Sequence, residues 1–237
     1  MTGTIRKAIE SSDSTALHAL VTSDPQLADA DVVFGEDGKN RVPPLHYVCD
    51  VVFRKLATQD EGLAMANVLL EAGVDVDRHY AKSGDTFLIA AASLGAERVG
   101  LRLVELGADV TRRGLFGATA LHWAAFMGLD ELAAPLVEAR SEIELRDTRY
   151  DRTPLQWALY GWTDGPIGRR AGIPSVLRTL VQRGAQVAPD VIDRFVSAAD
   201  KGKRPTAYSC TLLLCLGSAV NDGPHGNHRH SAAPLIA

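Results

Sequence analysis

A short sequence pattern recurs along the chain with a period of 33 to 34 residues, and this period restricts the possible folds more than any other feature. The copies are Thr86-Phe-Leu-Ile-Ala-Ala-Ala, Thr119-Ala-Leu-His-Trp-Ala-Ala and Thr153-Pro-Leu-Gln-Trp-Ala-Leu. An earlier copy, Pro43-Pro-Leu-His-Tyr-Val-Cys, begins 43 residues before Thr86. Repetition at periods of roughly 20 to 50 residues is typical of arrays in which each unit packs on its neighbours. We therefore expect a repeat array.

A second pattern follows the first by about 20 residues in each copy. Its copies are Leu69-Leu-Glu-Ala-Gly-Val-Asp-Val, Leu103-Val-Glu-Leu-Gly-Ala-Asp-Val, Leu136-Val-Glu-Ala-Arg-Ser-Glu-Ile and Leu180-Val-Gln-Arg-Gly-Ala-Gln-Val. Two of the steps are longer by about ten residues, and both additions fall between the first and the second pattern of their copy. We interpret them as insertions, near residues 53–62 and 161–172, in one equivalent loop.

The two patterns together resemble the ankyrin repeat, in which Thr-Pro-Leu-His opens a first helix and Gly-Ala-Asp-Val follows a second. The resemblance covers roughly residues 40–190. It implies an all-α solenoid of about five helix-turn-helix repeats with hairpin-like connecting loops. We expect an N-terminal capping repeat at residues 1–38, the array at 39–200 and an irregular or disordered tail at 201–237, since terminal repeats differ from internal ones. The content of alanine, leucine, arginine and aspartate resembles bacterial members of the family.

The copy that contains Leu136-Val-Glu-Ala-Arg departs from the pattern in two places. Glycine ends a helix in the left-handed conformation without a Cβ penalty, and Arg140 replaces the glycine found at Gly73, Gly107 and Gly184. Pro135 falls inside the second helix expected for this copy. A proline there removes a helical hydrogen bond, so we predict a kink or a late start.

Two histidines and one cysteine belong to the first pattern. The resemblance implies that the rings of His46 and His122 hydrogen-bond the backbone of adjacent turns. Cys49 shares a helical face with His46, which leaves open a thiolate and imidazole dyad for nucleophilic catalysis. However, Cys49 occupies a small-residue packing position of the repeat, which favours a buried thiol.

Histidines in the tail, His225, His228 and His230, have short spacings that a metal ion could use. Cys210 and Cys215 lie upstream, but their spacing does not match a zinc knuckle. We therefore predict neither a metal nor a cofactor.

Aromatic residues recur in two consecutive copies, with Trp123 and Trp157 at the same position. One interpretation is packing between repeats. The other is a binding patch on the first-helix side, because tryptophan, tyrosine and arginine dominate interface energetics. The patch would consist of Trp123, Phe126, Trp157, Tyr160 and Trp162, flanked by Arg169 and Arg170 of the second insertion.

The resemblance also implies that partners bind at the hairpin tips and first helices. The corresponding residues are Arg78, His79, Tyr80, Lys82, Arg112, Arg113, Leu115, Phe116, Arg146, Thr148, Arg149 and Tyr150. Because these positions are rich in arginine within an acidic chain, we expect a partner with an acidic surface.

Composition excludes several function classes. With 25 basic and 29 acidic residues, the chain has a net charge of −4, which argues against nucleic-acid binding. The longest apolar stretch, near residues 212–216, is too short to span a membrane, and the start does not resemble a signal peptide. Three cysteines do not form a disulfide framework, so we expect a reducing cytoplasm.

No sequence motif indicates an enzyme: a phosphate-binding glycine loop, His-Glu-x-x-His and Gly-x-Ser-x-Gly are all missing. We therefore predict a non-catalytic, monomeric adaptor that binds another protein. The alternative is a small-molecule-binding or catalytic protein that uses an aromatic cleft around Trp123, Trp157 and Tyr160. A closed pocket holding these rings and His122, with a polar group pointing inward, would favour that alternative.

Overall fold

A computed structural model describes residues 2–35, 38–80, 82–164 and 171–187. Its elements in chain order are α1 (Thr2–Glu10), α2 (Ser14–Ser23), η1 (Pro25–Ala28), β1 (Val32–Phe34), β2 (Asn40–Val42), α3 (Pro44–Phe53), α4 (Gln59–Glu71), α5 (Phe87–Leu94), α6 (Glu97–Glu105), η2 (Leu115–Gly117), α7 (Ala120–Met127), α8 (Asp130–Glu138), α9 (Pro154–Asp164) and α10 (Ile173–Gln182).

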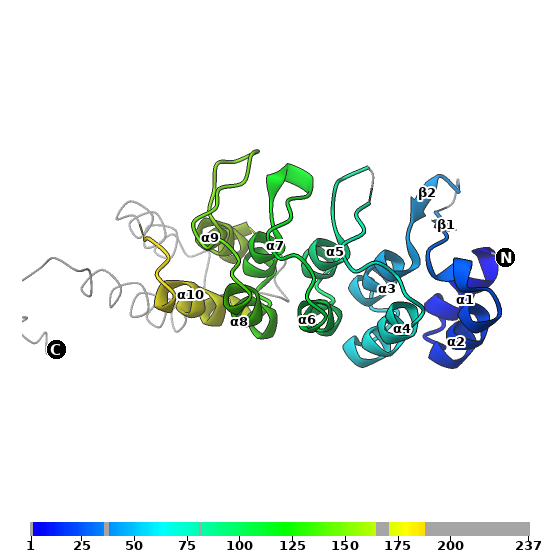
Figure 1. The fold of residues 1–237 in the computed structure, drawn as a ribbon. Helices are drawn as coiled ribbons and strands as arrows, with labels where there is room; N and C mark the ends of the chain where they lie inside the picture. The colour runs from blue at the N-terminus through cyan, green and yellow to red at the C-terminus, as the bar shows by residue number, and fades with distance from the viewer. Residues whose placement is uncertain (1, 36–37, 81, 165–170, 188–237) are drawn as a thin grey trace, which may run out of the picture. The chain divides into compact units, whose positions relative to one another are not determined.

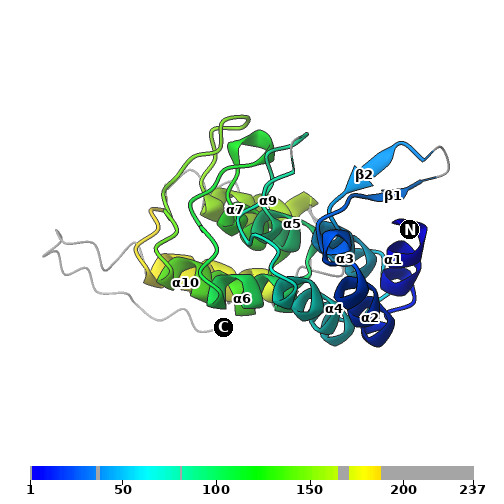
Figure 2. The same ribbon diagram turned by 45° about the vertical axis from the view of Figure 1, so that its right-hand side comes forward.

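The helices lie in two layers. The first helices of the repeats, α3, α5, α7 and α9, pack side by side in one layer (Figure 1). The second helices α4, α6, α8 and α10 continue from α2 in the other layer, as the turned view in Figure 2 also shows. The loops that lead into α5, α7 and α9 project beyond the first-helix layer. We call the last two of these loops the second tip (residues 108–118) and the third tip (residues 141–152). The arrangement confirms the predicted helical repeat solenoid.

The recurring threonine starts α5, α7 and α9 for a physical reason. A helix leaves its first backbone N–H groups without partners, and a threonine hydroxyl satisfies one of them. Thr86 Oγ1 accepts from the N–H of Ile89 at 3.3 Å, and Thr153 Oγ1 accepts from that of Gln156 at 3.4 Å. The sequence period thus corresponds to a repeated helix start.

The second helices end in the left-handed conformation, as the glycine pattern predicts. Gly107 has φ of 82°, and Arg140, at the same position of the next repeat, is held at 69°. Arg140 bears a Cβ that makes this conformation unfavourable by about 1–2 kcal/mol. At this position the repeat of α8 therefore carries local strain that its neighbours, with Gly107 and Gly184, lack.

Helix α8 begins in register with its counterpart in the preceding repeat. It begins at Asp130, 33 residues after α6 begins at Glu97. The predicted late start is therefore wrong, and Pro135 lies inside the helix. Proline has no N–H group, so it donates no hydrogen bond to the carbonyl of Glu131 one turn earlier.

The first insertion, which we interpreted as a loop, is a loop only at residues 54–58, and its remainder belongs to α4. It lengthens α4 to 13 residues, against nine for α6. A capping box explains this: Thr58 Oγ1 accepts from the N–H of Glu61 at 3.2 Å, and the Glu61 carboxylate accepts from the N–H of Thr58 at 2.7 Å. The second insertion extends α9 to Asp164, and residues 165–170 lie outside the described ranges.

A short strand pair, which we did not predict, precedes α3. β1 and β2 are antiparallel, with Val32 opposite Val42. Val32 is fully buried, and the ring of Phe34 packs on Tyr47 of α3 with 5.0 Å between centroids. Apolar packing on α3 therefore fixes this pair. Within the described ranges, no helix is long and apolar enough to cross a membrane.

A candidate aromatic binding pocket

A pocket of about 280 Å³ lies between α7, α9 and the tips that lead into them. The described residues that line it are Phe116, Trp123, Phe126, Tyr150, Arg152, Trp157 and Tyr160. Six of these are aromatic. Four of the six belong to the predicted aromatic patch, and the other two, Phe116 and Tyr150, belong to the predicted hairpin tips. The structure brings these two groups together in one site.

The six aromatic residues form three pairs at equivalent repeat positions: three residues before the starting threonine, four after it and seven after it. The pairs are Phe116 with Tyr150, Trp123 with Trp157, and Phe126 with Tyr160. The preceding repeat has small residues at the same positions, namely Ser83, Ala90 and Ser93. That repeat forms the same pair of helices, so the fold itself does not require aromatic residues here.

The rings contact one another across the two repeats. Trp123 and Trp157 meet edge-on, with 4.9 Å between centroids, and Phe126 stacks on Tyr160 at 5.9 Å. Phe116 and Tyr150 are 5.6 Å apart at the tips. Tilted, edge-on and offset-stacked pairs at these distances are favourable for aromatic quadrupoles. The pocket walls are therefore held together by their own ring contacts.

Exposure separates a buried base from an open rim. Trp157 is only 5% exposed, whereas Tyr150 and Tyr160 are 51% and 46% exposed. Trp162 is also 5% exposed and does not line the pocket, so we leave it out of the contact surface. Buried packing residues and accessible residues thus occur together in one cluster. The predicted Arg169 and Arg170 lie outside the described residues.

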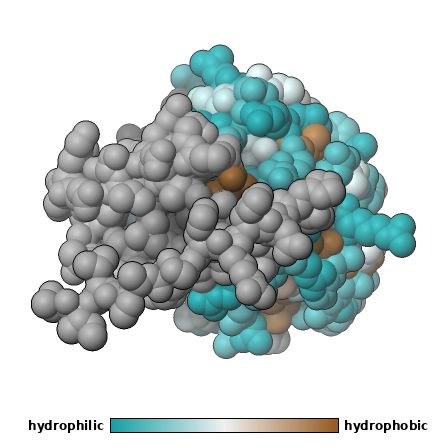
Figure 3. Space-filling model, turned by 90° about the vertical axis from the view of Figure 1, so that its left-hand side faces the viewer, coloured by the Kyte–Doolittle hydropathy of each residue, from teal (hydrophilic) through white to brown (hydrophobic). Residues whose placement is uncertain are grey.

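Of the other large exposed apolar side chains in the described part of the chain, three lie away from the pocket and one, Leu115, is next to Phe116 in η2. The first three are Phe53, Leu56 and Leu106. On the face drawn in Figure 3, hydrophilic residues cover most of the described surface and hydrophobic ones form small separate spots. Scattered residues of this kind are normal on protein surfaces.

A buried carboxylate organises the third tip beneath the pocket. Asp147 accepts hydrogen bonds from the indole N–H of Trp157 at 2.9 Å and from the backbone N–H groups of Arg149, Tyr150 and Arg152 at 2.9, 2.6 and 3.0 Å. Burial alone raises the pKa of Asp147, but these hydrogen bonds outweigh it and the pKa is lowered. Asp147 therefore fixes both Trp157 and the rim residue Tyr150.

His122 joins α7 to the third tip, and no part of it is exposed. The N–H of Thr119 donates to His122 Nδ1 at 3.2 Å, which leaves Nε2 as the protonated nitrogen. Nε2 lies 3.1 and 3.2 Å from the carbonyl oxygens of Leu145 and Arg152. Burial lowers the pKa of His122 to about 4. The ring is thus a neutral structural bridge and does not line the pocket.

The arginines of the tips differ in what they contact. Arg78 pairs with Asp29 and Asp31, and Arg113 donates to the carbonyl oxygens of Gly117 and Arg146 at 2.9 and 2.6 Å. These two arginines hold the chain together, so we remove them from the contact surface.

Most of the remaining tip residues are exposed. Arg112 and Arg149 are exposed, as are His79, Lys82 and Thr148, while Tyr80 is half-buried. Arg146 is exposed and pairs with Asp151 at 3.2 Å. Arg112 and Arg149 therefore remain candidates for contact with an acidic partner.

The possible catalytic dyad does not form. Cys49 is fully buried, and burial raises the pKa of its thiol to about 12, so the nucleophilic thiolate is suppressed. The ring of His46 packs edge-on against Tyr80 instead, with 5.8 Å between centroids. No group of three metal-ligating side chains occurs among the described residues, and the tail histidines and cysteines lie outside them.

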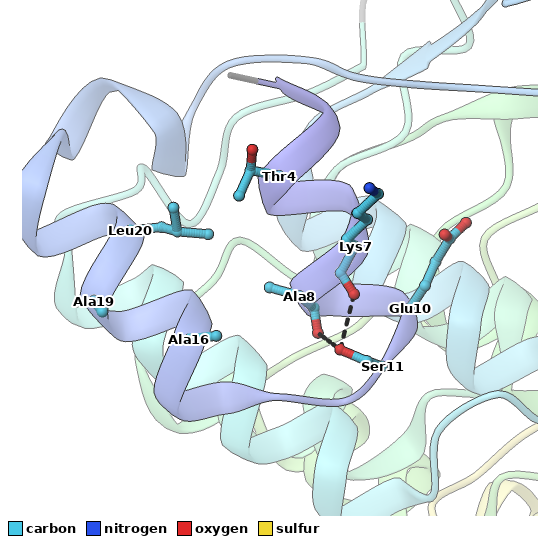
Figure 4. Close-up of a pocket in the computed structure, with 8 residues that line it drawn as sticks. All are labelled: Thr4, Lys7, Ala8, Glu10, Ser11, Ala16, Ala19 and Leu20. Atoms are coloured by element: carbon cyan, nitrogen blue, oxygen red, sulfur yellow. Dashed lines mark hydrogen bonds between the residues drawn. The ribbon is translucent and has the colours of Figure 1, made fainter.

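A second depression, of about 730 Å³, lies between α1 and α2 (Figure 4). Ala16, Ala19 and Leu20 of α2 line one side, and residues of α1 line the other. Ser11 in this depression donates to the carbonyl oxygen of Lys7 at 2.9 Å, and Glu10 accepts from the hydroxyl of Tyr47 at 2.6 Å. Two of its polar side chains, Ser11 and Glu10, therefore already have partners within the chain.

Sequence reasoning missed Arg152 and Asp147. Arg152 directly precedes the starting threonine, where the two preceding repeats have Asp85 and Ala118. A comparison of the copies position by position would have revealed this change. Asp147 has no equivalent in the earlier copies, and its role depends on contacts made in the folded tip.

Comparison with known proteins identifies the repeats. The family model for ankyrin repeats (3 copies) matches residues 54–147. The inactive serine/threonine-protein kinase TEX14 of Bos taurus is 36% identical over 91 residues, and that of Mus musculus is 34% identical over 96 residues. These alignments cover 38% and 40% of this chain but 6% of each relative. The bacterial character of the sequence remains a prediction. Residues 54–147 of the chain therefore contain ankyrin repeats.

Proposed function

We propose that the chain is a non-catalytic, monomeric, cytoplasmic adaptor that binds another protein at the aromatic pocket and the two tips beside it. Ankyrin repeats are generally protein-interaction modules. The proposal adds a location to this general role. The contact surface would comprise Phe116, Trp123, Phe126, Tyr150, Arg152 and Tyr160, with Arg112 and Arg149 at its edge.

The observation that supports this location is the aromatic substitution of two consecutive repeats at three equivalent positions. The preceding repeat folds with Ser83, Ala90 and Ser93 at these positions. Aromatic side chains at the centre of a contact surface are the common anchors of protein interfaces. A stripe of such residues that the fold does not need is therefore best explained by binding.

The pocket also bears on the alternative function. Small-molecule binding requires a pocket, and this one could serve. However, its described lining contains no histidine, cysteine or carboxylate. General acid–base catalysis depends on such groups within reach of the substrate. The described geometry thus favours binding over catalysis, and small-molecule binding remains the second candidate.

The test replaces the two exposed tyrosines by the residues of the preceding repeat. Tyr150→Ser and Tyr160→Ser together remove the rim of the pocket, and both positions are exposed. We expect a partner captured by the full-length protein to be lost from this double variant, while the circular dichroism spectrum stays unchanged. Leu106→Ser, at an exposed apolar site outside the pocket, is the matched control and should retain the partner.

Equal capture by all three proteins would contradict the proposed location. A small molecule that stays bound through purification, is detected by native mass spectrometry and is lost only from the double variant would instead support the second candidate.

A further inference from the structure

We infer that the aromatic pocket accepts an apolar side chain of a partner peptide together with a neighbouring Asp or Glu carboxylate, which pairs with Arg152. This inference rests on the proposed function and adds the chemistry of the ligand. Its basis is the set of polar groups that face or adjoin an otherwise aromatic site.

Arg152 is held in place by its backbone and leaves its charge available. Its N–H donates to Asp147 at 3.0 Å, and its carbonyl oxygen lies 3.2 Å from His122 Nε2. The guanidinium lies over the rings of Tyr160 and Tyr150, 5.1 and 5.9 Å from their centroids. Among the described residues it makes no ion pair. It is therefore a positioned cation in the pocket wall.

Neighbouring carboxylates do not neutralise Arg152. Asp147 already accepts four hydrogen bonds from the third tip and Trp157. Asp151 pairs with Arg146 at 3.2 Å. A carboxylate from outside the chain would thus find an arginine whose charge has no counter-ion in the described structure, and a charge-assisted hydrogen bond to it would be strong.

Trp123, which lines the pocket, carries a further donor. The indole N–H of Trp123 is buried and has no hydrogen-bond acceptor among the described residues. Arginine and tryptophan side chains donate hydrogen bonds and accept none. Because Arg152 lines the pocket beside six aromatic side chains, the occupant should supply acceptor oxygens as well as apolar surface.

The charge of Arg152 also argues against a cationic ligand. Aromatic boxes bind ammonium groups through cation–π contacts, and here Arg152 itself occupies the faces of Tyr150 and Tyr160. A second cation would be repelled. The volume of about 280 Å³ is close to the lower end of ligand pockets, roughly 300 Å³, and suits one apolar side chain with its acidic neighbour.

The test is a selection on the purified full-length protein from a phage-displayed library of random peptides about a dozen residues long. The peptides are fused through their C-termini, so only Asp and Glu side chains supply carboxylates. We expect enriched sequences to combine an aromatic or branched aliphatic residue with an adjacent Asp or Glu. Changing the Asp to Asn, or the Glu to Gln, should weaken binding of the synthetic peptide about tenfold.

Arg152→Gln should weaken binding by a similar factor, and the two changes together should cost no more than either alone. The control is Arg178→Gln, at an exposed arginine of α10 outside the pocket, which should bind as the unchanged protein does. Circular dichroism checks that both variants fold.

Other results would overturn the inference in distinguishable ways. Peptides that depend on Tyr150 and Tyr160 but not on Arg152 or on a carboxylate would leave the proposed function standing and refute the ligand chemistry. Enrichment of lysine-rich peptides would also refute it. If no peptide binds but N-acetylphenylalanine does, and its neutral amide does not, the carboxylate comes from a small acid, and both the peptide inference and the proposed protein-binding function fail.

Discussion

At the scale of single residues, His122 couples the stability of the array to pH. Its ring bridges Thr119 to the carbonyl oxygens of Leu145 and Arg152, and burial lowers its pKa from 6.5 to about 4. Because the folded pKa lies below the unfolded one, the unfolded chain binds the proton first as the pH falls. The contribution of neutral His122 to the free energy of unfolding is complete above about pH 6.5. It is lost progressively as the pH falls to about 4.

We therefore predict that the free energy of unfolding falls by about 3 kcal/mol between these pH values because of His122 alone. His122→Gln should lack this component, and urea titrations of both proteins at each pH measure the difference. Glutamine keeps the helix start: Gln156 holds the equivalent position, and its side-chain oxygen accepts from the N–H of Thr153 at 3.1 Å. The same pH dependence in both proteins would show that His122 is not the group responsible.

The sequence predicted residues whose role is local. The starting threonines, the structural role of His122 and the left-handed site of Arg140 depend on neighbours in the chain and on the repeat. The role of Arg152 depends on where its guanidinium lies relative to Tyr150 and Tyr160, and that of Asp147 on four donors gathered by the folded tip. Such convergence of side chains does not follow from spacing alone.

At the scale of elements, the close approach of α9 to α7 sets the geometry of the pocket. A Cβ at Gly161 would collide with the backbone carbonyl of Phe126. The same two helices carry the stacked rings of Phe126 and Tyr160. Glycine at position 161 thus permits the helix contact on which the ring contact depends.

We predict that Gly161→Ala lowers the free energy of unfolding by about 1–3 kcal/mol and also weakens ligand binding at the pocket. Gly100→Ala is the matched control. Gly100 lies on α6, and its Cβ would come closest to the flexible end of the Leu132 side chain, at 2.8 Å from Cδ2. Chemical denaturation and peptide affinity measured for both variants separate the two effects. Equal losses of affinity would mean that the α7–α9 contact does not shape the pocket.

The elements were predictable where the repeat is regular and less so elsewhere. The paired helices follow from the repeat period. The first insertion has no counterpart in the neighbouring copies, so the period predicts nothing about it. Its helical character was nevertheless encoded in Thr58 and Glu61, whose spacing is that of a capping box. The strand pair of Val32–Phe34 and Asn40–Val42 is too short to be distinguished from a loop by alternation, and packing against α3 stabilises it.

At the scale of the whole array, hydrogen bonds link each tip to the next. Asp77 accepts from the N–H of Asp109 at 2.8 Å, and Asp85 accepts from that of Leu115 at 2.9 Å. The carbonyl oxygen of Phe116 accepts from the N–H of Thr148 at 2.8 Å. Contacts therefore pass from repeat to repeat, and stability in such an array is a sum of unit and nearest-neighbour contributions.

Because each repeat contacts only its neighbours, we predict that the two ends of the array can unfold in separate transitions. Ile9 of α1 is fully buried, so Ile9→Ala should destabilise the first helix pair by about 2–5 kcal/mol. All three tryptophans lie on α7 and α9, so their fluorescence reports only on the pocket repeats, while circular dichroism reports on all helices. In Ile9→Ala we expect the dichroism transition in urea to begin before the fluorescence transition, with the pocket's affinity for its ligand unchanged. Coincident transitions in the variant would instead mean that the array unfolds as one cooperative unit, so that the pocket depends on the intact N-terminal end.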